Sequence, residues 1–419
     1  MKKIFLLSII FVTGSNLLYS QWIWQQVNPT YYYYDVQFVN KNTGYVCGSN
    51  TTIEKTTDGG LTWFNQSVNA AQDKNFNGIS MLNENTGYIA GSANIVVKTI
   101  NGGINWLVLK DGNYQTGNTF NDISFINLNT GWICGFGGNI QKTTDGGLTW
   151  DSIIVNNGNS TFRNIQFFDQ NTGYACRDGA VYTWKSTDGG FNWFRQYLQD
   201  SAIASWANMH FINRDTGWVV GEGSINRIYR TTNGGLNWVF MSTLIGPGTF
   251  EAYSIAFINF NSGWVGGSVG KIFSTTNSGI SWIDDNANSP GFVAGFSFYK
   301  DSLVWATGGH GAIGYKNIFI GIRKIGENVP VNFNLYQNYP NPFNPNTIIK
   351  FDIYTDLSKV NLIVYDVLGN EISHLVNNQL FHRGSYSVSF DGSNLPSGVY
   401  LYKLTSGDYI ETKKMLMIK

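Results

Sequence analysis

The chain of 419 residues carries 27 Lys and Arg against 27 Asp and Glu, 48 glycines, 16% aromatic residues and 13% charged residues. The balanced charge gives no electrostatic reason to expect nucleic acid or an anionic membrane as a partner. Few charges, many aromatic residues and glycine above its usual share of about 7% argue against disorder and against a helix-rich enzyme. They favour many short strands joined by tight turns.

Residues 1–20 have the features of a secretory signal peptide. Two lysines at the start are followed by an apolar run at residues 4–12 and by the small residue Ser20. This run is far shorter than the roughly 20 residues that span a bilayer, so it does not predict an anchor helix, and no later segment predicts one. We expect cleavage after Ser20 and a protein that is secreted or held at the outer-membrane cell surface.

Two short sequence motifs recur after the expected signal peptide. The string Lys-Thr-Thr-Asp-Gly-Gly-Leu-Thr-Trp occupies residues 55–63 and returns unchanged at 142–150, with variants in four more places. The six copies are spaced by 43 to 45 residues and close at Trp63, Trp106, Trp150, Trp193, Trp238 and Trp282. An Asn-Thr-Gly-aromatic string, or a close variant, precedes each copy, and an apolar alternating segment precedes that string.

Each unit therefore predicts strand, turn, strand, hairpin, strand, box turn and strand, the content of one propeller blade. A seventh unit at residues 296–315 supplies three strands and lacks the fourth. Residues 22–27 resemble the strand that follows each box, so we expect them to complete this last blade. The fold prediction is all-β: a seven-bladed propeller over residues 21–320, followed by a small Ig-like sandwich.

The repeated strings resemble Asp boxes (BNR repeats), and together with the Asn-Thr-Gly turn they are most similar to the propeller of photosystem II stability/assembly factor-like proteins. The resemblance covers about residues 22–316 and implies that the boxes are structural turns away from the binding face. The residues assigned to this structural role are Asp58, Asn101, Asp145, Asp188, Asn233 and Asn277. A row of catalytic or calcium-binding carboxylates is the alternative, and Asn in three of the six boxes counts against it.

The C-terminal residues carry a second resemblance, to the type A C-terminal sorting domain of type IX secretion substrates. The matching segments are 339–347, 364–371, 384–386, 397–402 and 413–419. Independently, residues 349–353 and 386–390 alternate with period two, as half-buried sandwich strands do. We expect a linker at 321–333, a sorting domain at 334–419, and the type IX secretion machinery as its partner.

Catalytic chemistry is not evident in the propeller. A sialidase gathers arginines around the axis, whereas the arginines here fall in the fourth and fifth blades. Asp35, Asp122 and Glu251 lie near strand starts, but nothing singles out a carboxylate pair. We therefore assign no catalytic residue, and an Asp-box glycoside hydrolase of sialidase-like or xyloglucanase-like type is the alternative.

Metal and cofactor sites are not expected either. The four histidines are scattered, and no Cys/His spacing suits zinc. His210 occupies a position filled by Gln or Ser in other blades, which favours a structural polar residue. Cys47, Cys134 and Cys176 occupy one equivalent position in three blades, which favours small buried residues with free thiols.

A ring of aromatic residues is the candidate binding feature. Three residues before the first apolar anchor of five blades stand Tyr33, Phe76, Phe120, Phe162 and Trp206. If the first strands line the central channel, these rings surround its mouth and can stack on sugars or grip a peptide; the alternative is that they pack between blades. The four tyrosines at 31–34 cannot all be buried. We interpret the chain as a non-catalytic binding or assembly module for a glycan or protein ligand, with a purely structural envelope component as a further alternative.

Overall fold

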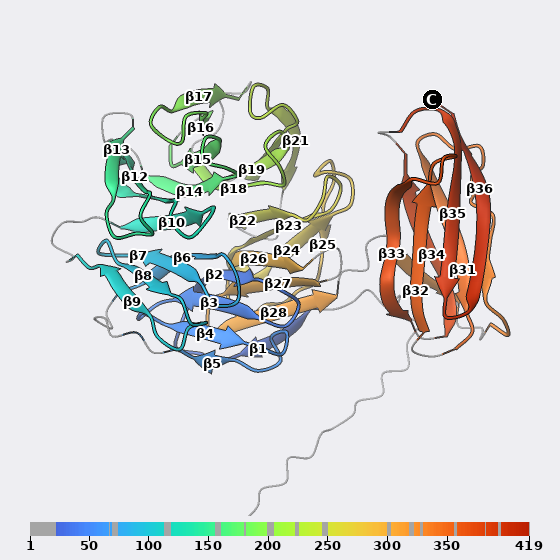
Figure 1. Cartoon of the computed structure of the whole chain (residues 1–419), viewed down its shortest axis with the longest axis horizontal. Coiled ribbons are helices and arrows are strands. Elements are labelled where there is room, and N and C mark those ends of the chain that lie inside the picture. The colour runs from blue at the N-terminus through green and yellow to red at the C-terminus, as the bar shows by residue number, and fades with distance from the viewer. Residues whose placement is uncertain are drawn as a thin grey trace, which may run out of the picture. The chain divides into compact units, whose positions relative to one another are not determined.

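The computed structural model describes residues 22–66, 68, 74–112, 119–155, 161–179, 182–198, 205–222, 226–244, 250–299, 303–317, 322–326, 330–355, 358–381, 383–392 and 395–418. The expected signal peptide lies outside these residues. Contacts divide the chain into two compact units, one over Gln21–Ile318 and one that contains Phe319–Lys419 (Figure 1). In the part of the chain that the structure describes, no helix has the length and apolar character needed to cross a membrane.

The first unit is a propeller. Within its described residues it forms seven four-stranded antiparallel sheets. Blades one to three contain β2 (Tyr33–Phe38), β3 (Gly44–Gly48), β4 (Ile53–Thr56) and β5 (Phe64–Asn65); β6 (Phe76–Met81), β7 (Gly87–Gly91), β8 (Val96–Thr99) and β9 (Leu107–Lys110); and β10 (Phe120–Phe125), β11 (Gly131–Gly135), β12 (Asn139–Thr143) and β13 (Asp151–Ile154). Short 3₁₀ turns lie at η2 (Phe136–Gly138) and η4 (Ser268–Gly270).

The remaining blades repeat this order. Blades four to six contain β14 (Phe162–Phe167), β15 (Gly173–Arg177), β16 (Tyr182–Ser186) and β17 (Phe194–Tyr197); β18 (Ser205–Phe211), β19 (Gly217–Glu222), β20 (Asn226–Thr231) and β21 (Val239–Leu244); and β22 (Ala252–Phe257), β23 (Gly263–Gly267), β24 (Ile272–Thr275) and β25 (Ile283–Asp284). The first strands of neighbouring blades contact one another in a closed ring, β2 to β26 included. The first strand of each blade is therefore the innermost, as expected.

The seventh blade takes its outer strand from the beginning of the described chain. It contains β26 (Val293–Tyr299), β27 (Leu303–Gly308), β28 (Ala312–Asn317) and β1 (Ile23–Gln26), and β1 pairs with β28 through Ile23 opposite Tyr315. Two indoles fasten this strand to the preceding blade: Trp24 Nε1 donates to the Ala287 carbonyl at 2.7 Å, and Trp22 Nε1 donates to Asp285 Oδ2 at 3.1 Å. The predicted seven-bladed propeller and its closing strand are confirmed.

Aromatic triplets hold neighbouring blades together. In one of them, Trp132 of blade three stacks on Phe167 of blade four with centroids 3.6 Å apart, and Trp193, the box tryptophan of blade four, meets Phe167 edge-on. Equivalent triplets are Tyr88–Phe125–Trp150, Tyr174–Phe211–Trp238, Trp218–Phe257–Trp282 and Trp305–Phe38–Trp63. Each ring pair adds roughly 1 kcal/mol beyond its buried area.

Each box turn closes on its own polar side chain. Asp145 Oδ1 accepts the Thr143 hydroxyl at 2.8 Å and the Thr149 N–H at 3.0 Å, and its Oδ2 accepts the Thr149 hydroxyl at 2.6 Å. These hydrogen bonds lower the pKa of Asp145 to about 2. Where Asn stands instead, the side-chain oxygen accepts the same two kinds of donor, as at Asn101. The carboxylates are thus bonded within their own turns.

The second unit is a sandwich of two four-stranded sheets. One has the order β29-β34-β31-β30 and the other β33-β32-β35-β36. Their bounds are β29 (Ile322–Gly326), β30 (Asn334–Leu335), β31 (Asn346–Ile353), β32 (Ser358–Tyr365), β33 (Glu371–Phe381), β34 (Gly384–Asp391), β35 (Gly398–Ser406) and β36 (Tyr409–Met417). The prediction of a linker at 321–333 is wrong for residues 322–326. These residues form β29, which pairs with β34 as the edge strand of its sheet and so belongs to the sandwich.

Candidate functional site

The aromatic residues predicted to ring the mouth are mostly buried. Tyr33, Phe76 and Phe162 are 0% exposed and Phe120 is 1% exposed. Each packs into the cluster formed with the preceding blade; Phe120, for example, lies with Tyr88 of blade two. A fully buried ring offers no face to a ligand, so the expectation of an open ring of these four aromatics is corrected. Trp206 is the second residue of β18 in blade five, and its side chain lies outside the described residues.

A β-bulge near the start of each first strand explains this correction. In blade one, Tyr33 opposes Gly48 and Asp35 opposes Cys47, so Tyr34 is an extra residue in the strand. The same shift occurs in all seven first strands. Strict alternation would put Tyr33 and Val36 on opposite faces, whereas one extra residue puts both on the buried face. Sequence periodicity carries no sign of this extra residue.

Glycines opposite the bulge were a signal that went unused. A Cβ atom at Gly48, Gly91 or Gly135 would lie 1.9–2.0 Å from the carbonyl oxygen of the residue just before the facing first strand. The bulge brings the two strands this close, so only glycine fits. Blade four departs from the rule with Arg177.

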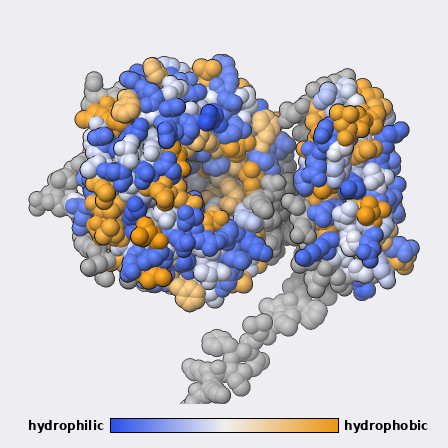
Figure 2. Space-filling model, viewed as in Figure 1, coloured by the Kyte–Doolittle hydropathy of each residue, from blue (hydrophilic) through white to orange (hydrophobic). Residues whose placement is uncertain are grey.

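The entry mouth of the ring is aromatic on one side. Tyr32, just before β2, stacks on Phe292, just before β26, with centroids 5.8 Å apart. His310 meets Tyr32 edge-on, and Tyr253 meets Phe292 edge-on at 6.0 Å. We call Tyr32, Tyr253, Phe292 and His310 the mouth cluster; they come from blades one, six and seven. Tyr32 is 39% exposed and His310 is exposed. Figure 2 shows the propeller surface hollowed near its middle.

The opposite side of the mouth is polar. Asn77 and Asn121 occupy the bulge position of blades two and three, and their amides donate to the first-strand carbonyls of the next blade at 2.8 and 2.7 Å. Arg163 occupies this position in blade four and pairs with Asp178 at 2.6 Å. The mouth therefore combines aromatic faces with amide and ionic groups, a pairing typical of small-ligand and peptide sites.

Deeper in the ring, side chains tie first strands to one another. In six of the seven blades one equivalent position supplies an acceptor for a backbone N–H of the following blade, at 2.6–3.2 Å, whereas blade six carries Ala256 there. The six acceptors are Gln37, Ser80, Ser124, Gln166, His210 and Ser297. His210 Nδ1 accepts the Phe257 N–H, and burial lowers the pKa of His210 to about 4. His210 is thus a neutral acceptor in an inter-blade hydrogen bond.

Two carboxyl groups also link blades. Asp35 Oδ2 accepts the Ile79 N–H at 3.0 Å, and Asp122 Oδ2 accepts the Ile165 N–H at 2.8 Å. Burial raises the pKa of Asp35 to about 7, and burial together with the Asp35 charge raises the pKa of Asp122 to about 8. Raised values mean that these groups favour the fold most at low pH and less as the pH rises toward 8. Both are bonded to backbone, so we assign neither a catalytic role.

The three cysteines lie opposite this level of the ring. Cys47 and Cys134 oppose Asp35 and Asp122, and Cys176 opposes Asn164. All three are buried with free thiols, and burial raises the pKa of each. They act as small apolar residues. Among the described residues, no group of three or more His, Cys, Asp or Glu is placed to hold a metal ion.

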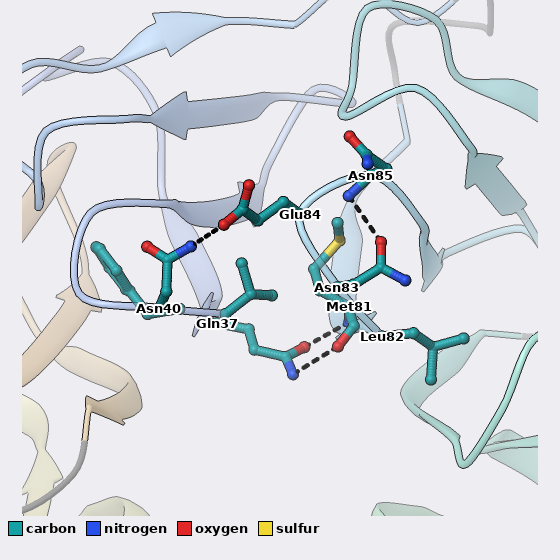
Figure 3. Close-up of a pocket in the computed structure, with 9 residues that line it drawn as sticks. Gln37, Asn40, Met81, Leu82, Asn83, Glu84 and Asn85 are labelled. Atoms are coloured by element: carbon teal, nitrogen blue, oxygen red, sulfur yellow. Dashed lines mark hydrogen bonds between the residues drawn. The ribbon is translucent and has the colours of Figure 1, made fainter.

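A groove of about 680 Å³ lies at the other end of the first strands, between the turns of blades one and two (Figure 3). The amide of Gln37 exchanges two hydrogen bonds with the backbone of Met81, at 2.6 and 3.1 Å. The amide nitrogen of Asn40 donates to Glu84, and Asn83 Oδ1 accepts the Asn85 N–H at 2.8 Å. These polar groups hold the two turns together, so we assign this groove no ligand.

Comparisons with known families agree with both parts of the chain. The family model described as Photosynthesis system II assembly factor YCF48 matches residues 15–113 and 110–239, more than half of the chain. The model described as Secretion system C-terminal sorting domain matches residues 337–419. Among curated proteins, none matches the sequence significantly.

Solved structures share the propeller fold. A structure of YCF48 bound to D1 peptide is 21% identical, covers 72% of this chain and 98% of its own, and has a TM-score of 0.59. YCF48 from Cyanidioschyzon merolae is 17% identical, with coverage of 70% and 98% and a TM-score of 0.58. The WD40 propeller of Doa1 is 10% identical, with coverage of 73% and 97% and a TM-score of 0.53. At these identities the likeness shows the fold alone.

Proposed function

Because this chain belongs to the family of photosynthesis system II assembly factor YCF48 and ends in a type IX secretion sorting domain, we propose that it is a non-catalytic binding module that works outside the cell. The sorting domain implies secretion or attachment at the cell surface through type IX secretion. A role in photosystem assembly does not suit that location, so we propose only that the binding character of the fold is retained.

The mouth cluster is the observation that supports a binding role. The box turns and the inter-blade hydrogen bonds repeat around the ring, which is the pattern of a scaffold. The mouth does not repeat: Tyr32 and Tyr253 bring aromatic rings to blades one and six, whereas the bulge positions of blades two and three carry Asn77 and Asn121. Partly exposed rings beside hydrogen-bonding groups suit recognition better than stability.

A protein or a glycan is the ligand class that fits these groups. Aromatic faces stack on sugar rings or on peptide side chains, and the amides and the Arg163–Asp178 pair offer hydrogen bonds around them. A relative of the same fold has been solved as YCF48 bound to D1 peptide, which favours a protein ligand within this class.

The test compares a variant of the mouth cluster with a control variant of the outer strands. Both are assayed as the mature chain on arrays of immobilised peptides and oligosaccharides. The Tyr32→Ala, Tyr253→Ala double variant should lose at least roughly tenfold in affinity for any arrayed ligand that the unmodified chain retains, about 1.4 kcal/mol. The matched control is Phe64→Ala with Phe194→Ala, which removes two exposed aromatic rings from outer strands. The control should bind normally, and all three proteins should melt at similar temperatures.

Two outcomes would contradict the proposal. The double variant retaining full binding would remove the mouth cluster as the site. Hydrolysis of an arrayed oligosaccharide by the unmodified chain would make the protein an enzyme.

A further inference from the structure

Exposed apolar side chains of the C-terminal domain gather on one end of the sheet β33-β32-β35-β36. Tyr400, Tyr402 and Met415 are buried, so their alternating neighbours on β35 and β36 face outward. Val399 lies directly opposite Leu416 in this pairing, and both are 37% exposed. Leu401 is two residues further along the same face.

A rigid turn adds two more apolar side chains at this end. The turn joins β32 to β33, and Asp366 holds it: its Oδ1 accepts the Leu368 and Asn370 N–H groups at 2.8 and 2.9 Å, and its Oδ2 accepts the Asn370 amide at 2.8 Å. These hydrogen bonds lower the pKa of Asp366. Val367 and Leu368 project from the turn and are 67% and 83% exposed. Because these hydrogen bonds fix the turn, both side chains stay exposed to solvent.

Four of the five segments that resemble a sorting domain meet at this end. Residues 339–347 reach it because the Phe343 N–H donates to the Leu416 carbonyl at 2.9 Å, and the Ile418 N–H donates to the Phe343 carbonyl at 3.0 Å. Tyr365 opposes Leu401, which brings residues 364–371 beside residues 397–402. Only residues 384–386 lie elsewhere, paired with the far end of β31.

On β32 and β35 the same face becomes polar toward its other end. Along β35, Val399 and Leu401 give way to Lys403 and Thr405, and along β32, Tyr365 and Ile363 give way to Asn361 and Lys359. Figure 2 shows hydrophobic residues gathered at the end of this domain that carries the C-terminus. An apolar end on an otherwise polar face is the usual mark of a contact surface.

We propose that this apolar end is the surface on which the type IX secretion machinery docks. We call it the sorting patch and define it as Val367, Leu368, Val399, Leu401, Leu416 and Ile418. The choice of partner rests on the family match, because the patch residues lie within residues 337–419, which match the Secretion system C-terminal sorting domain. Segments distant in sequence are brought to one surface, so the machinery reads a folded surface rather than a linear tail. The ligand proposed for the propeller plays no part in this inference.

The experiment measures export of the full chain from a bacterium that has type IX secretion. Leu368→Gln tests the turn, and Val399→Gln with Leu416→Gln tests the sheet face. The matched control is Ile410→Gln, which changes an apolar residue that is 67% exposed at the opposite end of the same sheet. Immunoblots of periplasm, cell surface and medium give the exported fraction.

We expect both patch variants to accumulate in the periplasm at least roughly tenfold over the unmodified chain, while Ile410→Gln is exported normally. Protease resistance of the retained chain should match that of the unmodified chain, because Leu368 makes little packing contact. Normal export of the patch variants, equal retention of the Ile410 variant, or retention that tracks lost protease resistance would each overturn the proposal.

Discussion

The close approach of β10 and β11 makes Gly135 one of the least replaceable residues of the propeller. Gly135 has extended backbone angles, so a left-handed conformation is not the reason for glycine here. A Cβ atom would lie 1.9 Å from the Thr119 carbonyl oxygen, and real Cβ contacts stay above 3.0 Å. In Gly135→Ala the strands must therefore separate by more than 1 Å.

The cost follows from what that separation breaks. The Phe136 N–H, just after β11, donates to the same Thr119 carbonyl at 2.9 Å, and losing this bond costs about 1–2 kcal/mol. Backbone shifts forced by overpacking add about 1–3 kcal/mol. We expect Gly135→Ala to lower the free energy of unfolding by about 3 kcal/mol or more.

Gly137, in the same hairpin, is the matched control. Nothing lies within 4 Å of a Cβ atom there, and its φ of 73° costs alanine only about 1 kcal/mol. Denaturant unfolding followed by tryptophan fluorescence reports the propeller, because all 14 tryptophans lie between residues 22 and 305. Equal destabilisation by Gly135→Ala and Gly137→Ala would refute the steric reasoning.

Three further predictions concern the box, the closing strand and the ring. Asp145→Asn should keep the melting temperature, since Asn fills this position in three other boxes, whereas Asp145→Ala should lower it. Equal melting temperatures for the two variants in calorimetry would contradict the turn's dependence on the side-chain oxygen. Trp24→Ala removes a stacked ring and an inter-blade hydrogen bond, so it should lower the free energy of unfolding by about 2–3 kcal/mol. The control Phe64→Ala changes an exposed ring and should lower it by less than about 0.5 kcal/mol. Similar losses in denaturant unfolding would argue against closure of the propeller by β1. The lowered pKa of His210 predicts that its stabilisation is complete above pH 6.5 and declines as the pH falls toward about 4, an effect of about 2 kcal/mol after allowance for partial exposure. His210→Gln keeps an acceptor but not this titration, so the unmodified chain should lose more stability than the variant between pH 7 and 4. Parallel stability curves for the two proteins would contradict this sign.

The blade architecture was predictable because it depends on local signals that repeat. The box at residues 55–63 and the Asn-Thr-Gly turn before it recur at one spacing, and each fixes a turn through its own side chains. The closing role of residues 22–27 was predictable because they resemble the strand after each box. These turns and strands can be predicted without knowing which blades contact one another.

The mouth was not predictable because it depends on a bulge and on contacts between blades. Tyr33 and Val36 are three residues apart, which strict alternation would place on opposite faces, yet both are buried because Tyr34 is an extra residue between them. The contact of Tyr32 with Phe292 joins residues that only ring closure brings together. The strand at 322–326 was likewise missed, because its partner β34 lies about sixty residues further along.

The seventh blade also governs the order of assembly. Its outermost pairing, Ile23 with Tyr315, spans nearly three hundred residues, and contacts of such long range form slowly. Until then two strands lack their partner, β28 and β1, and each presents an unpaired edge. During export such an edge can pair with another peptide. A free peptide with the sequence of residues 22–27 should therefore bind β28 in place of β1 and leave the propeller unclosed.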